Sequence, residues 1–170
     1  MRALLPLALL AVLPVTLGGC GLTPMYAGGG SGTVASGLAQ VEVAPIEGKA
    51  GWLVANALRD RLGAGGQGGA ARYRLQVKLD DDITGLAIRR DDSVARERRT
   101  LRARYQLVEI GQDGVVLDAT AGSDAGIDVV GSEYATIAAE ATALERLSET
   151  VADQIVTRIA LYVKRTPTGE

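Results

Sequence analysis

Two stretches in the middle of the chain alternate strictly between apolar and polar residues. The first runs from 71 to 80, with apolar residues at Tyr73, Leu75, Val77 and Leu79. The second runs from 100 to 107, with apolar residues at Leu101, Ala103, Tyr105 and Leu107. Successive side chains of a strand point to opposite faces of a sheet. This period of two therefore predicts two strands, each with one buried face and one polar face.

Two shorter stretches also have the composition of strands. Leu38–Ile46 is rich in β-branched residues and predicts a first strand. Gln112-Asp113-Gly114 is a hairpin turn signal, so Val115–Ala121 is expected to pair antiparallel with the strand before it. The charged segment 81–96 is expected to form a connection between the two central strands.

Apolar spacings of three and four residues predict two helices. The first covers Trp52–Leu62 and ends at the glycine-rich run that follows it. The second is longer and runs from Ser132, a plausible N-cap, to about Val163. Its apolar stripe consists of Ile137, Ala141, Leu144, Val151, Ile155, Ile159 and Tyr162.

The predicted order is strand, helix, three strands, helix. Each strand has one apolar face and each helix one apolar stripe, which favours an α+β fold in two layers. We expect a sandwich in which two helices pack on one face of a roughly four-stranded, mostly antiparallel sheet. The other face of that sheet is expected to be polar and basic.

The amino terminus has the composition of a secretory signal peptide. Arg2 precedes an apolar run that ends at Leu17, and two glycines follow before Cys20. A membrane-spanning helix is the alternative, but it needs about 20 uninterrupted apolar residues, and this run is shorter and contains two prolines. The signal-peptide interpretation is therefore favoured.

Leu17-Gly18-Gly19-Cys20 resembles the bacterial lipobox, in which the cysteine carries the lipid. Cys20 is the sole cysteine, so it has no intramolecular disulfide partner. The alternative is an ordinary signal peptide with an incidental cysteine. The predicted organisation is a removed signal peptide at 1–19, a lipidated flexible tether at 20–37, a single α+β domain at 38–165 and a disordered tail at 166–170.

Composition narrows the possible chemistry. The sequence has no histidine, which excludes histidine-dependent triads and histidine zinc sites. Gly63, Gly65 and Gly68 match a dinucleotide-binding spacing, but here a helix precedes the glycines and a strand follows, the reverse of the order that motif needs. The acidic residues between 80 and 91 approximate a calcium loop with unsuitable ligands at two positions. We therefore expect no cofactor, no metal site and no catalytic role.

Charge is distributed unevenly along the chain. Residues 72–104 contain ten basic and six acidic residues, whereas residues 105–170 contain four basic and eleven acidic residues. The alternation places a basic group on one sheet face, with Arg96, Arg98 and Arg99 at its edge. This candidate surface for anionic ligands consists of Arg72, Arg74, Lys78, Arg102 and Arg104. The alternative is a solvated face whose charges only prevent aggregation. The net charge of −2 and the export signal argue against nucleic acid as a partner.

The order of several segments resembles the LPS-assembly lipoprotein family, LptE. Cys20-Gly21-Leu22-Thr23-Pro24-Met25-Tyr26 is similar to that family's lipidated opening, with Leu22 in place of the usual aromatic residue. Tyr73-Arg74-Leu75 and the segment 102–107 resemble its central strands. Segments between Tyr134 and Tyr162 look like its closing helix. The resemblance spans essentially the whole mature chain.

The resemblance implies a non-catalytic lipoprotein of lipopolysaccharide export. In that family the lipoprotein is a plug in the outer-membrane barrel LptD, assists its assembly and can bind lipopolysaccharide. The five basic residues would then meet the anionic groups of lipopolysaccharide. Gly21 follows the lipidated cysteine where an aspartate would favour the inner membrane, so we expect an outer-membrane, periplasm-facing anchor. The main alternative is an auxiliary lipoprotein of another envelope lipid-transport or secretion complex, and a lipid-anchored hydrolase is a second one.

Overall fold

The computed structural model describes residues 32–63, 70–88, 94–112 and 114–166. Its elements follow one another along the chain as three helices and four strands. In order they are α2 (Thr33–Leu38), β1 (Val41–Val43), α3 (Gly48–Gly63), β2 (Tyr73–Ile88), β3 (Val94–Glu109), β4 (Gly114–Asp128) and α4 (Glu133–Arg165). The predicted signal peptide, Cys20 and residues 167–170 lie outside the described residues.

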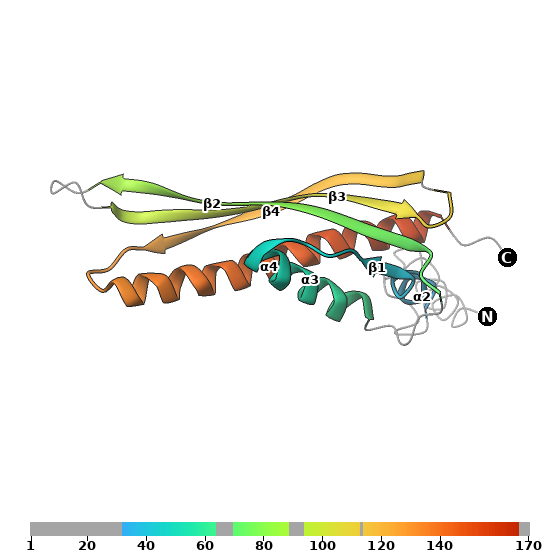
Figure 1. Cartoon of the computed structure of the whole chain (residues 1–170), viewed down its shortest axis with the longest axis horizontal. Helices are drawn as coiled ribbons and strands as arrows, with labels where there is room; N and C mark the ends of the chain where they lie inside the picture. Colours follow the sequence, from blue (N-terminus) through green and yellow to red (C-terminus); the bar gives the residue numbers. More distant parts are fainter. Residues whose placement is uncertain (1–31, 64–69, 89–93, 113, 167–170) are drawn as a thin grey trace, which may run out of the picture.

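The four strands form one sheet in the order β1-β2-β3-β4 (Figure 1). β1 pairs parallel to β2, and the three longer strands pair antiparallel. All three helices lie on the same side of the sheet, with α4 running along almost its whole length (Figure 1). The predicted α+β fold with helices on one face of a mostly antiparallel sheet is confirmed.

The buried face of the sheet follows the period of two. Leu75, Leu107 and Leu117 are paired across β2, β3 and β4, and Leu75 and Leu107 are fully buried. Tyr105 and Leu101 of β3 are also buried, while Arg102 and Arg104 between them are exposed. The same strands therefore supply the core with their odd-numbered residues and the outer face with their even-numbered residues.

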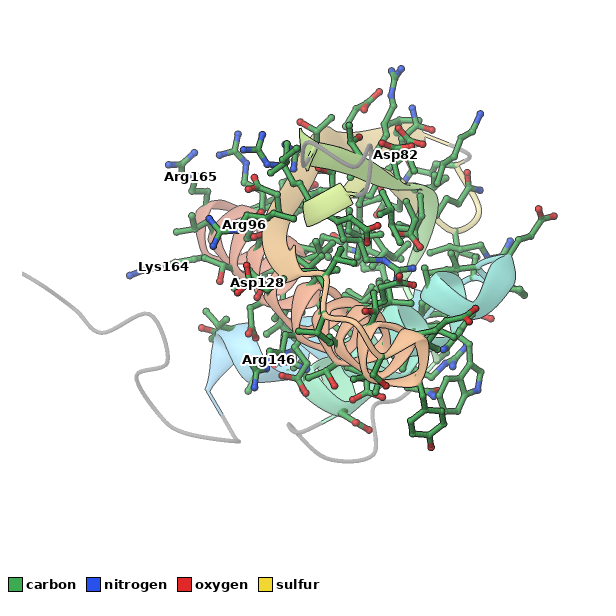
Figure 2. All side chains as sticks on the ribbon, turned by 90° about the vertical axis from the view of Figure 1, so that its left-hand side faces the viewer. Asp82, Arg96, Asp128, Arg146, Lys164 and Arg165 are labelled. Carbon is green, nitrogen blue, oxygen red and sulfur yellow. The ribbon has the colours of Figure 1, made fainter. Side chains whose placement is uncertain are left out.

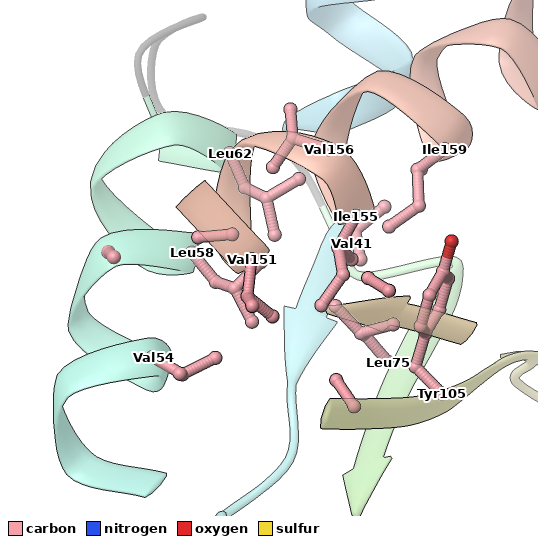
Figure 3. Close-up of a cluster of buried hydrophobic side chains, with 14 of the residues drawn as sticks. Val41, Val54, Leu58, Leu62, Leu75, Tyr105, Val151, Ile155, Val156 and Ile159 are labelled. Carbon is pink, nitrogen blue, oxygen red and sulfur yellow. The ribbon is translucent and has the colours of Figure 1, made fainter. Parts of the chain in front are cut away.

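The helices cover this face with continuous apolar stripes. Val54, Leu58 and Leu62 of α3 meet Val151 and Ile155 of α4 over the sheet (Figure 3). α4 begins as predicted, because the Ser132 hydroxyl accepts a hydrogen bond from the Ala135 N–H. Two polar side chains of α4 are buried, and both have local partners: the Ser148 hydroxyl donates to the Leu144 carbonyl at 2.8 Å, and the Thr136 hydroxyl donates to the Ser132 carbonyl at 3.3 Å.

The start of the folded domain differs from the prediction. Residues 33–37, which were assigned to the tether, and Leu38, which was assigned to the first strand, form the helix α2, and the first strand is limited to Val41–Val43. α2 belongs to the domain because Val34 and Leu38 are buried in the core. Gly37 packs so closely on Val163 of α4 that a Cβ atom would collide with it. Gly37, one of the glycines that suggested a flexible tether, is therefore required by close packing.

The predicted connection at 81–96 is also wrong over most of its length. β2 continues to Ile88 and β3 begins at Val94, so the two strands extend far beyond the apolar alternation. Cross-strand ion pairs accompany this extension: Asp81 with Arg99, and Arg96 with Asp128 of β4. Such pairs stabilise a sheet without apolar residues, which is why hydrophobic periodicity did not reveal it.

Gly37 provides a test that α2 is packed on α4. Gly37→Val is expected to lower the free energy of unfolding by about 1–3 kcal/mol, because the added methyl groups overfill the contact with Val163. Gly63→Val is the matched control, since no atom lies within 4 Å of a Cβ built there. Urea denaturation measures both variants, and equal stability of the two would contradict the packing of α2.

Candidate functional site

The outer face of the sheet brings three of the five predicted basic residues together. Lys78, Arg104 and Thr120 are paired across β2, β3 and β4, and Asp80, Arg102 and Gly122 form the neighbouring row. These two rows surround a shallow groove of about 680 Å³ on the polar face. The groove is lined by main-chain or side-chain atoms of both rows, together with Asp124 and Gln154.

Arg104 is held in place by an ion pair at one side of this groove. Its Nη2 donates to Asp118 Oδ2 at 3.1 Å, and Gln106 Nε2 donates to the same oxygen at 2.9 Å. The hydrogen bond from Arg104, reinforced by that from Gln106, lowers the pKa of the Asp118 carboxyl. Both groups are solvent-exposed, so this ion pair orients the guanidinium more than it stabilises the fold.

Arg102 lies across a glycine of the neighbouring strand. A Cβ atom on Gly122 would lie 2.5 Å from Arg102 Cδ and 2.8 Å from its Nη1, so any other residue at 122 would move the Arg102 side chain from this position. The same glycine is fixed from the helix side. Gln154 of α4 accepts from the Gly122 N–H at 3.0 Å and donates to the Gly122 carbonyl at 3.3 Å. Gly122 thus positions Arg102 and connects the edge strand β4 to α4.

Arg72 and Arg74 lie at the end of the sheet, apart from this groove. Arg74 pairs with Glu42 of β1 at 3.6 Å. Arg72 precedes β2 and donates to Glu109 at 3.1 Å, with its guanidinium 5.2 Å from the centre of the Tyr73 ring. The hydrogen bond to Glu109 raises the pKa of Arg72. The five basic residues therefore do not form one continuous row.

The outer face is also less basic than the sequence predicted. Asp80 and Asp124 line the groove beside Lys78, Arg102 and Arg104, which leaves a local charge near +1. The predicted basic face consisted of the cations of the two central strands, and it left out Asp80 of β2 and Asp124 of β4. Once β4 is registered against β3, the alternation of β4 places Asp118, Thr120 and Asp124 on the same face.

Arg99 was expected at the edge of the basic face, and the strand register shows that this prediction is wrong. Its odd position places it on the helix side of the sheet, where its side chain is 13% exposed. Nε and Nη2 donate to the two Asp81 carboxylate oxygens at 2.8 and 2.6 Å, and Nη1 donates to the Glu140 carbonyl of α4 at 3.0 Å. The hydrogen bond to Asp81 raises the pKa of Arg99. This ion pair joins the sheet to α4 where apolar contacts become sparse.

A second groove of about 740 Å³ lies between β4 and α4. It is lined by Tyr105 and Thr120 on the sheet side and by Asp153, Gln154 and Arg158 on the helix side, among others. Thr120 and Gln154 border both grooves, so the edge of β4 separates them. Burial raises the pKa of the Tyr105 hydroxyl.

The part of the chain that the structure describes contains neither a metal-binding cluster nor a membrane-spanning helix. Within residues 32–63, 70–88, 94–112 and 114–166, no three acidic or cysteine side chains are grouped so that they could hold a metal ion. None of the helices in these ranges is both long and apolar enough to cross a membrane.

Comparison with protein families gives a match over residues 38–159, to the family described as LptE, lipopolysaccharide-assembly. The match includes β1, α3, the three long strands and most of α4. This chain belongs to the LptE family. The predicted family membership is therefore confirmed, and no curated protein matches the chain in sequence.

Solved structures of bacterial lipoproteins have the same fold as this LptE-family chain. A putative lipoprotein from Caulobacter crescentus is 25% identical, with a TM-score of 0.64 over 81% of this chain and 100% of that one. A minor lipoprotein from Acinetobacter baumannii is 16% identical, with a TM-score of 0.59 over 72% and 91%. Rare lipoprotein B from Shewanella oneidensis is 13% identical, with a TM-score of 0.52 over 75% and 97%.

The ion pair between Arg99 and Asp81 can be tested by comparing two arginines of β3. Arg99→Met is expected to lower the free energy of unfolding by about 1–3 kcal/mol, because it leaves a half-buried carboxylate and the Glu140 carbonyl without their donor. Arg98→Met, on the exposed face of the same strand, is expected to change stability by less than about 0.5 kcal/mol. Equal effects of the two substitutions in urea denaturation would show that the ion pair contributes nothing.

Proposed function

We propose that this chain is a non-catalytic, lipid-anchored outer-membrane lipoprotein that assists the lipopolysaccharide-export barrel LptD and binds lipopolysaccharide. The observation that carries the proposal is the membership of residues 38–159 in a lipopolysaccharide-assembly family. The lipobox at Leu17–Cys20 supports the anchor, with the lipid on Cys20 after removal of residues 1–19. The description of the Caulobacter crescentus relative as a putative lipoprotein is in keeping with it. An acylated cysteine with more than one chain anchors a protein stably.

The groove on the outer sheet face is the proposed lipopolysaccharide site. Lys78, Arg102 and Arg104 supply three cationic groups within two adjacent rows of the sheet. Guanidinium groups bind phosphate and carboxylate in bidentate fashion, and lipopolysaccharide carries such groups near its lipid. Among the described residues, Lys78 and Arg102 make no ion pair, so both are available to a ligand. Arg104 is already paired with Asp118 and would contribute a hydrogen bond from its remaining N–H groups.

The polar sheet face also suits a protein that fills a barrel. The interior of an outer-membrane barrel is polar, so a plug needs a polar outer surface. Even-numbered residues of β2 and β3 provide one along most of the sheet. The face combines cations with the carboxylates of Asp80, Asp118 and Asp124, so it can form hydrogen bonds with wall residues of either charge.

Removal of the two unpaired cations tests the lipopolysaccharide site. Lys78→Gln and Arg102→Gln are each expected to weaken binding of purified lipopolysaccharide by about 10–100-fold, because each removes a charge-assisted hydrogen bond. Arg98→Gln is the control, since it removes the same charge from the same face outside the groove. Calorimetric titration measures the affinity of all three variants for lipopolysaccharide. Equal losses of affinity would show that binding depends on the total charge and not on this groove.

Two glycines of β4 allow the geometry to be tested without any change in charge. Gly122→Ala is expected to displace the Arg102 side chain and to weaken lipopolysaccharide binding about tenfold. Gly126→Ala is the matched control, because no atom lies within 4 Å of a Cβ built at that position. Unchanged binding in Gly122→Ala would contradict a role for the observed Arg102 position.

The alternative function is that of an auxiliary lipoprotein in another envelope lipid-transport or secretion complex. Purification of the lipidated protein from mild detergent distinguishes the two functions. We expect one large barrel protein to copurify tightly, because a plug buries much of its surface in its partner. Recovery of an inner-membrane complex in place of the barrel would support the alternative.

A further inference from the structure

The two edges of the sheet differ in length. β1 forms one edge and has three residues, whereas β4 forms the other edge and has 15 residues. The view along the long axis of the molecule shows β4 at the side of the sheet next to α4, with Asp128 near its end (Figure 2). An edge strand directs the main-chain N–H and C=O groups of every second residue away from the sheet. Within the described part of the chain, β4 is thus the long edge that no further strand covers.

Gly122 shows which residues of β4 direct their main-chain groups outward. Its N–H donates to Gln154 Oε1 at 3.0 Å, and its carbonyl accepts from Gln154 Nε2 at 3.3 Å. Both groups therefore point away from β3, although Gly122 lies opposite Arg102 in the register. Pairs that exchange hydrogen bonds alternate along an antiparallel ladder with pairs that do not. Thr120 and Asp124, two residues away on either side, consequently also direct their N–H and C=O groups outward.

The side chain of Gln154 occupies the position of a neighbouring strand. Its amide offers one donor and one acceptor to a single residue, as the main chain of an added antiparallel strand would. Between residues 114 and 128, no other side chain or loop of the described chain binds outward main-chain groups in this way. α4 therefore satisfies one residue of the edge and leaves its neighbours Thr120 and Asp124 available to a partner.

The composition of β4 permits another strand to approach. Proteins commonly protect an edge with lysine, proline, a bulge or a very short strand. Residues 117–128 contain neither lysine nor proline, and the register irregularity of β4 lies before them. From 119 to 126 the side chains are those of alanine, threonine, glycine and serine, apart from Asp124. A second main chain therefore meets no bulky side chain at this edge.

The groove of about 740 Å³ between β4 and α4 lies beside the same edge. α4 borders it with Thr150, Gln154, Thr157 and Leu161, which follow one another at spacings of three and four and form one stripe of the helix. All of these residues except Leu161 are exposed. The side chains of a strand alternate between the two faces of a sheet, so one set from an added strand would point into this groove and contact α4.

Two unpaired charges beside the edge indicate the composition of the strand that fits there. The other acidic residues of the groove and of β4 are paired with arginines, whereas Asp124 and Arg158 form no ion pair among the described residues. Asp124 lies on the outer face, and Arg158 lines the groove together with Tyr105 and its register partner Ala119. Positions 119 and 124 point to opposite faces. A strand with a basic and an acidic side chain on opposite faces, about five residues apart, therefore complements both charges.

A second copy of β4 does not have this composition. Residues 117–128 contain three aspartates and no lysine or arginine. Antiparallel pairing of two such edges would bring carboxylates together, and like charges across a ladder are destabilising. The edge therefore favours a strand from a different protein.

We propose that β4 accepts an extended segment of the barrel partner as an additional strand of the sheet. This inference rests on the proposed function, which supplies the partner, and it suits a chain that a barrel encloses, because segments of the barrel protein then surround the edge. Main-chain hydrogen bonds give an added strand its affinity, and its alternate side chains give it specificity. Lys78 and Arg102 belong to β2 and β3, so the added strand leaves the proposed lipopolysaccharide site on the outer face.

Two substitutions of Thr120 test the main-chain pairing in the lipidated full-length protein. Thr120→Pro removes an N–H that bonds to no atom of β3, and an edge strand tolerates proline at such a position. Thr120→Val removes the hydroxyl and keeps the N–H, so it is the matched control. We expect Thr120→Pro to recover about tenfold less barrel protein in mild detergent than the wild type, and Thr120→Val to recover as much as the wild type. Thermal unfolding shows whether each variant is folded.

Hydrogen exchange of the wild-type chain is a second measurement, which needs no substitution. In the chain alone, the outward amides of Thr120 and Asp124 are expected to exchange rapidly, whereas the amides of Ala119 and Ala121, which bond to β3, exchange slowly. Binding of the barrel is expected to slow exchange at Thr120 and Asp124 by at least about tenfold. This measurement decides the matter where the proline variant does not fold.

The outcomes separate this inference from the proposed function. Equal recovery of the barrel by the wild type and by Thr120→Pro, with no slowing of exchange at Thr120 and Asp124, overturns the inference while the proposed function stands. A wild-type chain that recovers no barrel overturns the proposed function and the partner named here. Exchange that slows with protein concentration in the absence of the barrel assigns the edge to a second copy, which also overturns the inference.

Discussion

The strict alternation of side chains along three long antiparallel strands is the constraint on which the rest of the structure depends. Because odd-numbered residues of β2 and β3 face the helices, the even-numbered residues between them must face outward. A shift of register by one residue would exchange the two sets and bury Arg102 and Arg104 in the place of Leu101 and Tyr105. The core and the candidate binding groove therefore lie on opposite faces of the same strands. The register that buries one set of side chains also places the other set in the groove.

α4 lies along the helix-facing side of the sheet, but its two ends contact different surfaces. Near its carboxyl end it packs on a leucine-rich sheet and on both shorter helices, with Ile155 and Ile159 fully buried. Nearer its start, where α3 no longer covers it, Arg99 and Asp81 replace apolar contacts between the sheet and the helix. The single groove-facing glycine, Gly122, is held by Gln154 between these two regions. The helix therefore supports the outer face of the sheet as well as closing the core.

The sequence predicted the fold class, the succession of strands along the chain and the approximate boundaries of α4, because these follow from apolar periodicity and from the Ser132 cap. It did not predict the far half of the β2–β3 hairpin, because charged cross-strand pairs stabilise that half and the residues there give no period of two in hydrophobicity. The helix α2 was missed because its glycine-rich segment has the composition of a linker, although Gly37 is required by close packing on Val163. For the candidate site, the periodicity of β2 and β3 correctly grouped Lys78, Arg102 and Arg104. It could not show the carboxylates of β4 or the separate pairing of Arg72, since both depend on register between strands.

The central claim is that the outer face of the sheet contacts the lipopolysaccharide-export machinery in the cell. The most direct measurement is photocrosslinking from Thr120, which borders the groove beside Lys78 and Arg104. We expect a crosslinker at this position to capture LptD or lipopolysaccharide, and one at Asn56 of α3, on the helix side of the molecule, to capture them much less. Capture of neither from Thr120, or of components of an inner-membrane complex, would contradict the account.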